Sequence, residues 1–166
     1  MNRTVRAVMT ESPIVLDCSA TPEEAACAMR DSNVGDVLIT RGGALLGIVT
    51  DRDLVVRHLA KGDASADGDL EAPCSTGAAT LRPDAEIEEA VRLMERHAVR
   101  RLPVVENGAP VGIVTLGDLA RARAPESALG QISTQPPTTD EVSPAAPIRR
   151  GDRWFSLCAS QYVGAK

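Results

Sequence analysis

One segment occurs twice in this sequence. GIVTDRDL at residues 47–54 returns as GIVTLGDL at residues 112–119, at an offset of 112 − 47 = 65 residues. The same offset aligns the preceding residues without a gap, so that Met29 matches Met94. Because the residues between the matches differ freely, the pattern indicates a tandem duplication of one folding unit rather than low-complexity sequence. Any ligand that the unit binds can therefore have two equivalent sites.

Each copy predicts the same order of elements, β-α-β-β-α. In the first copy, Thr21 precedes Pro-Glu-Glu, which is typical of a capped helix start with proline at its first position. In the second copy, Asp84 is the expected helix cap. Two strands follow, joined by short turns at residues 41–43 and 106–108, and the second turn contains the strong hairpin signal Asn-Gly. A last helix comes after the second strand.

This pattern predicts an α+β fold in which two β-α-β-β-α repeats share one core. A unit of 65 residues buries only about 60% of the surface that its unfolded chain exposes, so one repeat alone would be marginally stable. We expect the first repeat at residues 1–65 and the second at residues 66–134. Residues 135–166 are rich in proline, threonine and aspartate, and they are expected to form a mostly disordered tail that contains Trp154.

Composition argues against a nucleic-acid partner. The three aromatic residues all lie beyond the repeats, so the predicted core is aliphatic and offers no ring on which a base could stack. The formal net charge of −5 also provides no broad basic surface. The aromatic residues are Trp154, Phe155 and Tyr162.

The sequence contains no pattern typical of a metal site, a membrane span or an enzyme. Its four cysteines show no CxxC spacing and its two histidines, His58 and His97, are isolated, so no metal site is expected. The N-terminus leads into no long apolar run, which favours a cytoplasmic protein without a membrane span. No P-loop, GxGxxG motif or paired nucleophile and base is present, so we expect neither catalysis nor a catalytic cofactor.

The repeated motif Thr-x-x-Asp admits two interpretations. Thr50 with Asp53, and Thr115 with Asp118, lie where a strand turns into a helix. In the first interpretation they are helix caps and have no further role. The hydroxyl then accepts from the third backbone N–H, and the carboxylate lies at the positive end of the helix dipole. The same geometry also suits a ligand, because a helix start attracts phosphate and a carboxylate can accept from two ribose hydroxyls. The exact repetition of the motif strengthens the ligand-binding interpretation relative to the helix cap, and both interpretations stay open.

The pattern Gly-Ile-Val-Thr-x-x-Asp-Leu, the order of elements and the strand at residues 102–105 resemble the CBS (cystathionine-β-synthase) domain. The resemblance covers roughly residues 4–130 and is to a pair of such domains, a Bateman module, of the kind found in stand-alone bacterial proteins. It implies that the repeats pack about a pseudo-twofold axis and leave two clefts, which commonly hold adenine nucleotides such as AMP, ADP or ATP.

The resemblance also implies which residues bind the nucleotide. The threonine and aspartate of the family's motif map onto Thr50, Asp53, Thr115 and Asp118. Basic residues that face phosphate in several members lie where this chain has Arg100 and Arg101.

The two copies differ in charge around the motif. At the positions equivalent to Arg100 and Arg101, the first copy has Gly35 and Asp36, and it carries the additional acid Asp51. Charge therefore favours a phosphate near the second copy.

The expected function is a non-catalytic regulatory module that senses an adenine nucleotide and signals to a separate, unknown protein. The alternative is a protein-interaction scaffold whose clefts are empty or vestigial. We also expect a homodimer, because apolar helix faces in each copy need cover that a second chain can provide. These faces contain Ala25, Ala28 and Met29 in the first copy, and Val91 and Met94 in the second.

Overall fold

The computed structural model of this chain describes residues 4–61 and 68–135. Both repeats belong to one compact unit, Met1–Thr134. The predicted boundary between residues 65 and 66 lies outside the described residues, and so does the predicted tail beyond residue 135, with Trp154. None of the helices within the described ranges is long and apolar enough to cross a bilayer.

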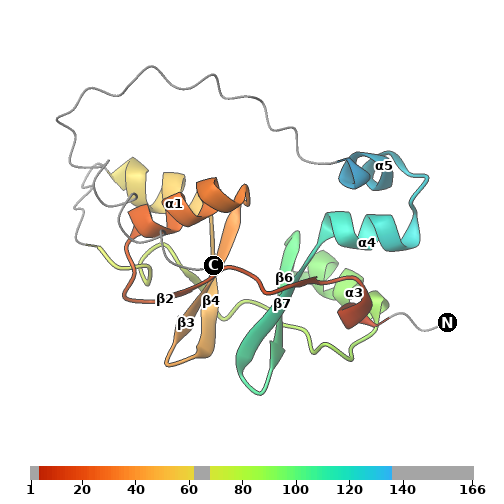
Figure 1. Cartoon of the computed structure of the whole chain (residues 1–166), viewed down its shortest axis with the longest axis horizontal. Coiled ribbons are helices and arrows are strands. Elements are labelled where there is room, and N and C mark those ends of the chain that lie inside the picture. Colours follow the sequence, from red (N-terminus) through yellow and green to blue (C-terminus); the bar gives the residue numbers. More distant parts are fainter. Residues whose placement is uncertain (1–3, 62–67, 136–166) are drawn as a thin grey trace, which may run out of the picture. The chain divides into compact units, whose positions relative to one another are not determined.

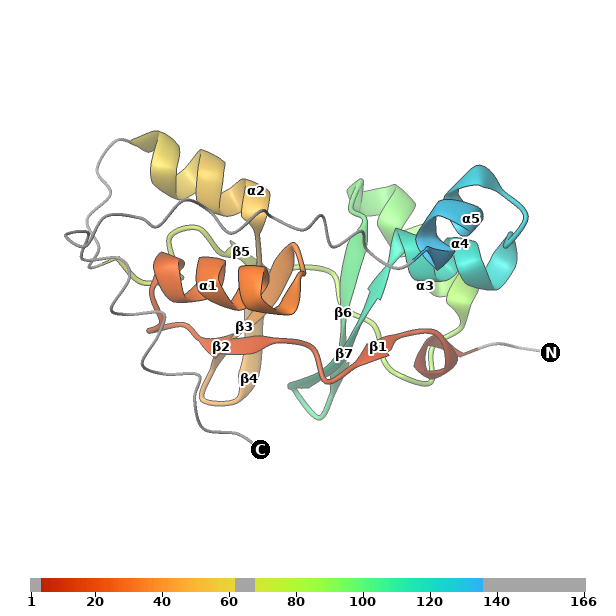
Figure 2. The same cartoon turned by 45° about the horizontal axis from the view of Figure 1, so that its top comes forward.

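The first repeat is built on a four-stranded sheet in the order β2-β3-β4-β5 (Figures 1 and 2; β5 is labelled in Figure 2). Its strands are β2 (Val15–Asp17), β3 (Asp36–Arg41), β4 (Ala44–Thr50) and β5 (Ser75–Thr76). The helix α1 (Pro22–Ser32) connects β2 to β3. After β4 the chain becomes helical through α2 (Asp51–Asp53), the π-helical turn η2 (Leu54–His58) and the 3₁₀ turn η3 (Leu59–Lys61).

The second repeat is built on a three-stranded sheet in the order β1-β7-β6. Its strands are β1 (Thr10–Glu11), β6 (Arg101–Glu106) and β7 (Ala109–Thr115). Its helical segments are η1 (Val5–Ala7), α3 (Ile87–His97), α4 (Leu116–Arg123) and α5 (Ala128–Thr134).

The two hairpins have the same register at the offset of the sequence repeat. Val37 pairs with Val49 in β3 and β4, and Leu102 pairs with Val114 in β6 and β7. Each hairpin also carries an irregularity at the same place along its first strand. The predicted α+β fold with two equivalent repeats is therefore confirmed.

Each sheet is completed by a short strand that precedes the other repeat in the sequence. β1 lies beside β7 of the second repeat, where Thr10 pairs with Ile113 (Figure 2). β5 pairs with β4 of the first repeat in the same antiparallel way. The exchange extends into the two cores, because Val5 is buried in the core of the second repeat and Leu70 in that of the first. Neither repeat therefore forms its core from consecutive residues alone.

The glycine of each GIVTxxD motif allows these short strands to approach. A Cβ atom on Gly47 would lie 2.3 Å from the carbonyl oxygen of Ser75, and one on Gly112 would lie 2.6 Å from the sulfur of Met9. A glycine inside a strand is typical of a position where a ligand or a neighbouring backbone approaches closely. In the structure the neighbouring strand occupies this space.

One of the two predicted helix caps is confirmed and the other is wrong. The Thr21 hydroxyl accepts from the backbone N–H of Glu24, whose carboxylate accepts from the Thr21 backbone in return. Asp84, in contrast, caps no helix. Its carboxylate binds the guanidinium of Arg82 at 2.9 Å, and α3 begins after Glu86, which caps it without a side-chain hydrogen bond.

The apolar helix faces that were expected to need a second chain are already covered within this one. Ala25, Ala28 and Met29 are buried in the core of the first repeat, and Met94 is buried in that of the second. Val91 packs against the second core as a partly buried residue. That basis for a homodimer is therefore wrong, because the sheet of each repeat covers these faces.

Candidate functional site

Both copies of the Thr-x-x-Asp motif form the same helix cap. Thr50 and Thr115 have identical backbone angles, φ −109° and ψ 162°. In each, the hydroxyl oxygen accepts from the aspartate backbone N–H at 3.2 Å. The hydroxyl donates its proton to the aspartate oxygen Oδ2, at 2.6 Å in Asp53 and 2.7 Å in Asp118. The threonine proton and one carboxylate oxygen are thus both used by the cap.

The second carboxylate oxygen, Oδ1, faces an arginine in each copy. The Arg57 Nε lies 3.3 Å from Oδ1 of Asp53, and Nη2 of Arg121 binds Oδ1 of Asp118. These arginines are not equivalent by the repeat offset, since Arg57 aligns with Ala122. Sequence reasoning missed them, although an arginine three or four residues after an aspartate on one helix is a recognisable pairing.

Asp118 lies on the wall of an open pocket of about 400 Å³ in the second repeat. The pocket also contains Ala7 and Val8 from the N-terminal segment, and Arg121 and Ala122 from α4. Asp118 is only 4% exposed, so this carboxylate is buried beside a guanidinium and a row of small apolar side chains. Such a pocket combines a hydrogen-bond acceptor, a positive charge and an apolar surface.

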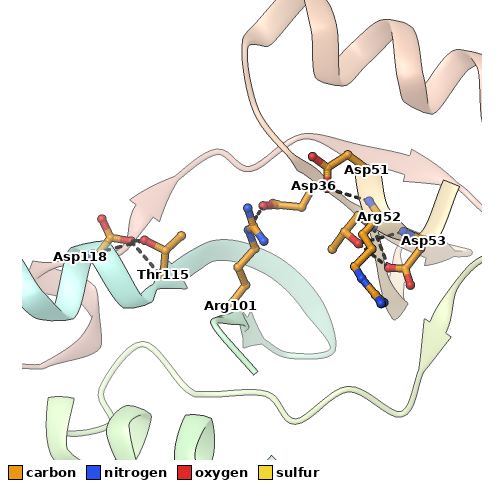
Figure 3. A network of polar contacts seen from close by, with 8 residues as sticks. Asp36, Asp51, Arg52, Asp53, Arg101, Thr115 and Asp118 are labelled. Carbon is orange, nitrogen blue, oxygen red and sulfur yellow. Dashed lines mark hydrogen bonds and ion pairs between the residues drawn. The ribbon is translucent and has the colours of Figure 1, made fainter. Parts of the chain in front are cut away.

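Arg101 is paired with its own equivalent in the first repeat. Its guanidinium binds Oδ2 of Asp36, the residue that lies 65 positions earlier. Figure 3 shows Arg101 directed at Asp36, between the Thr115–Asp118 motif and the residues around Asp51. A residue near a pseudo-twofold axis lies close to its symmetry equivalent. Because this position is aspartate in the first repeat and arginine in the second, the two side chains form an ion pair between the repeats.

The environment of this pair is crowded and partly buried. The Asp36 and Arg101 side chains are 14% and 33% exposed. A Cβ atom on Gly35 would lie 3.2 Å from Nη2 of Arg101 and 3.4 Å from Oδ2 of Asp51. Burial raises the pKa of the Asp36 carboxyl group, Arg101 opposes this rise, and the negative charge of Asp51 adds to it.

Arg100, the other basic residue singled out in the sequence, is exposed. Its carbonyl oxygen accepts from the backbone N–H of Leu116 at 2.9 Å, as that of Gly35 accepts from Asp51 at 3.2 Å. The structure therefore brings Thr115 together with Asp118, and Thr50 with Asp53. It pairs the backbone of Arg101 with Thr115 across the β6–β7 hairpin, and it directs the Arg101 guanidinium at Asp36.

The acidic and thiol groups near the first motif do not form a metal site. Burial raises the pKa of the Cys74 thiol to about 11, with a further increase from Asp53, so this thiol is protonated at neutral pH. Across the described part of the chain, no three histidine, cysteine or acidic residues come close enough together to hold a metal ion.

Comparison with known proteins identifies the family. The CBS domain model matches residues 5–58 and again residues 68–125. The chain is 38% identical over 118 residues to the CBS domain-containing protein YhcV of Bacillus subtilis, a match covering 70% of this chain and 82% of that one. It is 34% identical over 132 residues to Hypoxic response protein 1 of Mycobacterium tuberculosis, covering 77% and 90% of the two chains.

A solved structure shows the same fold. It is the CBS domain pair of protein MJ0100, in complex with 5′-methylthioadenosine and S-adenosyl-L-methionine. The TM-score is 0.65 at 24% identity, and the match covers 76% of this chain and all of that one. Together with the repeated motif and its geometry, the family match is decisive: this chain belongs to the CBS domain family and carries the domain twice.

Proposed function

We propose that this chain is a regulatory module that binds an adenine nucleotide, with Asp118 as the principal ribose ligand. The observation that carries the proposal is the pocket of about 400 Å³ at the second motif. The Asp118 carboxylate can accept from vicinal ribose hydroxyls, and Arg121 can face a phosphate. Ala7, Val8 and Ala122 provide the apolar surface against which a base can lie in a core without aromatic rings.

The fold supports the choice of ligand class. The CBS domain pair of MJ0100, which shares this fold, forms a complex with two ligands that each contain an adenosine group. Thr50 and Asp53 form a matching motif in the first repeat and are proposed as a second, weaker position. Arg100 and Arg101 remain candidates for phosphate contact, and Arg101 would have to leave Asp36 to make it.

The second candidate function is a protein-interaction scaffold with vestigial clefts. It is favoured by one observation: in both motifs the carboxylate oxygens already have partners within the chain. A nucleotide must therefore share Oδ1 with an arginine or displace that arginine, whereas a scaffold needs no such change. The proposed role is regulatory in either case, without catalysis, and it acts in the cytoplasm on a separate protein.

Asp118→Ala is expected to abolish nucleotide binding, and Asp53→Ala to leave most of it. Both variants lose the same helix cap, so each controls for the structural effect of the other. AMP or ATP at a hundredfold over its dissociation constant should stabilise the wild-type chain and Asp53→Ala by about 2.7 kcal/mol and Asp118→Ala by nothing measurable. Isothermal titration calorimetry and thermal melts would measure this. Equal loss in both variants would refute the choice of pocket, and no heat with any adenine nucleotide would favour the scaffold.

We also propose that two copies of the chain associate. Val55, Val56 and Leu59 lie on the helical segment after β4 and are 55%, 49% and 57% exposed. Three half-exposed aliphatic side chains on one short segment form a surface that a second copy can cover. Light scattering is expected to give twice the mass of 17.5 kDa, and Leu59→Asp should reduce it to the monomer. A wild-type monomer at micromolar concentration would contradict the proposal.

A further inference from the structure

The C-terminal helix of the described chain lies against the start of α4. α5 (Ala128–Thr134) follows a tight turn after α4, and the two helices lie side by side in both views (Figures 1 and 2). A Cβ atom on Gly117, in the first turn of α4, would lie only 2.9 Å from the hydroxyl of Ser133. This first turn is the one that carries Thr115 and Asp118. α5 therefore contacts the same turn that forms the proposed ribose site.

α5 is held by polar contacts rather than by the core. Its two large apolar side chains are exposed, Leu129 to 41% and Ile132 to 70%. Gly130 is the buried residue of the helix, packed against the backbone at the end of α4. A short helix that buries so little apolar surface separates from its neighbour at a small free-energy cost. A single side-chain contact can therefore decide whether it stays docked.

Arg121 provides that contact and also reaches the pocket. Its Nη1 donates to the carbonyl oxygen of Ser133 at 2.6 Å, and its Nη2 donates to Oδ1 of Asp118. The flat guanidinium thus bridges the helix and the carboxylate at once. Arg57, the arginine that faces Asp53 in the first repeat, donates instead to the Pro73 carbonyl and to the Ser75 hydroxyl, which belong to the segment around β5.

We propose that a ligand bound at Asp118 releases α5, so that this helix is the output element of the module. The inference rests on the proposed function. Oδ2 of Asp118 already accepts two hydrogen bonds from Thr115, so ribose hydroxyls reach this carboxylate at Oδ1, where they crowd the guanidinium of Arg121. An arginine displaced from Asp118, or turned toward a phosphate, no longer holds the Ser133 carbonyl. A ligand in the pocket thereby undocks α5, the helix that carries the exposed Leu129 and Ile132 side chains.

Hydrogen exchange of the full-length chain, read on the backbone amides of residues 128–134, tests this directly. Arg121→Lys keeps a positive charge beside Asp118 but removes the two separate donor nitrogens, Nη1 and Nη2, with which the guanidinium contacts its two partners. It is expected to raise the exchange of these amides at least tenfold without ligand. Ser133→Ala keeps the carbonyl acceptor and Arg57→Lys alters only the first repeat, so both should exchange like the wild type. Saturating AMP should accelerate the wild-type amides in the same way.

The outcomes test the Arg121 tether, the ligand-driven release of α5 and the proposed function separately. Equal exchange in Arg121→Lys and wild type would overturn the tether. Calorimetric binding of AMP with unchanged or slower exchange of residues 128–134 would overturn the release while leaving the proposed function intact. No binding heat with AMP, ADP or ATP would reject the proposed function and ligand-driven release together, and the Arg121→Lys result would still decide whether the tether exists.

Discussion

Arg101→Ala is expected to lower the free energy of unfolding by about 3 kcal/mol, because it leaves the partly buried Asp36 carboxylate without its counter-charge. Arg101 is one-third exposed, which places the effect at the lower end of the range for buried ion pairs. For a unit of this size the loss corresponds to roughly 10 °C in melting temperature. Denaturant titration and thermal melts of the purified chain would measure it.

Because Asp36 and Arg101 occupy equivalent positions, exchanging the two residues is a control for the ion-pair effect. Asp36→Arg and Arg101→Asp should each destabilise the chain, since each places two like charges between the repeats. The double exchange restores one acid and one base at two equivalent positions, and it should recover most of the lost stability. If the double variant is no more stable than the less stable of the two single variants, the Asp36–Arg101 ion pair does not stabilise the contact between the repeats.

The pH dependence of the same pair has a defined sign. Because burial raises the pKa of Asp36 in the folded state, the folded chain keeps this proton to a higher pH than the unfolded chain does. The stability that protonated Asp36 contributes is complete below its ordinary value of 3.8, and it is lost as the pH rises through the folded pKa. Asp36→Asn cannot titrate, so the free energy of unfolding of the wild type, measured relative to this variant, should fall as the pH rises across that range.

The repeat made much of the fold predictable. Hairpin positions follow from the alternation of apolar residues and from the turns at residues 41–43 and 106–108, where Gly43 and Gly108 have φ of 82° and 84°. The caps at Thr50 and Thr115 follow from residue type alone. Both signals are local, which is why a single sequence reveals them.

The features that escaped prediction depend on contacts between distant residues. β1 and β5 are two residues long and have no periodicity to reveal them, so their exchange between the repeats could not be read from pattern. Arg101 was interpreted as a phosphate ligand from the family resemblance, and Asp36 was interpreted only as the acid that replaces it in the first copy. Equivalent residues near an axis can instead be partners, and alignment of the two copies does not distinguish these cases.

Gly47→Ala is expected to destabilise the chain by about 3 kcal/mol, and Gly112→Ala by only about 1 kcal/mol. The two glycines occupy equivalent positions in the two motifs, and each is crossed by an exchanged strand. Neither has a left-handed backbone conformation, so the space beside the Cα atom, rather than φ, determines the effect. Thermal and denaturant unfolding of both variants would compare them directly.

The expected difference comes from what the new methyl group meets. At Gly47 it would lie 2.3 Å from the backbone oxygen of Ser75, so β5 itself must move away from β4, and the buried Cys74 must move with it. At Gly112 the closest atom is the sulfur of Met9 at 2.6 Å, the end of a flexible side chain that can rotate, while the Thr10 backbone oxygen lies farther away at 3.1 Å. A repulsion that a rotamer change can relieve destabilises less than one that must shift the backbone. Equal destabilisation by the two substitutions would contradict this prediction. It would mean that β1 and β5 resist displacement equally, and that the atoms beside the two glycines do not determine the loss of stability.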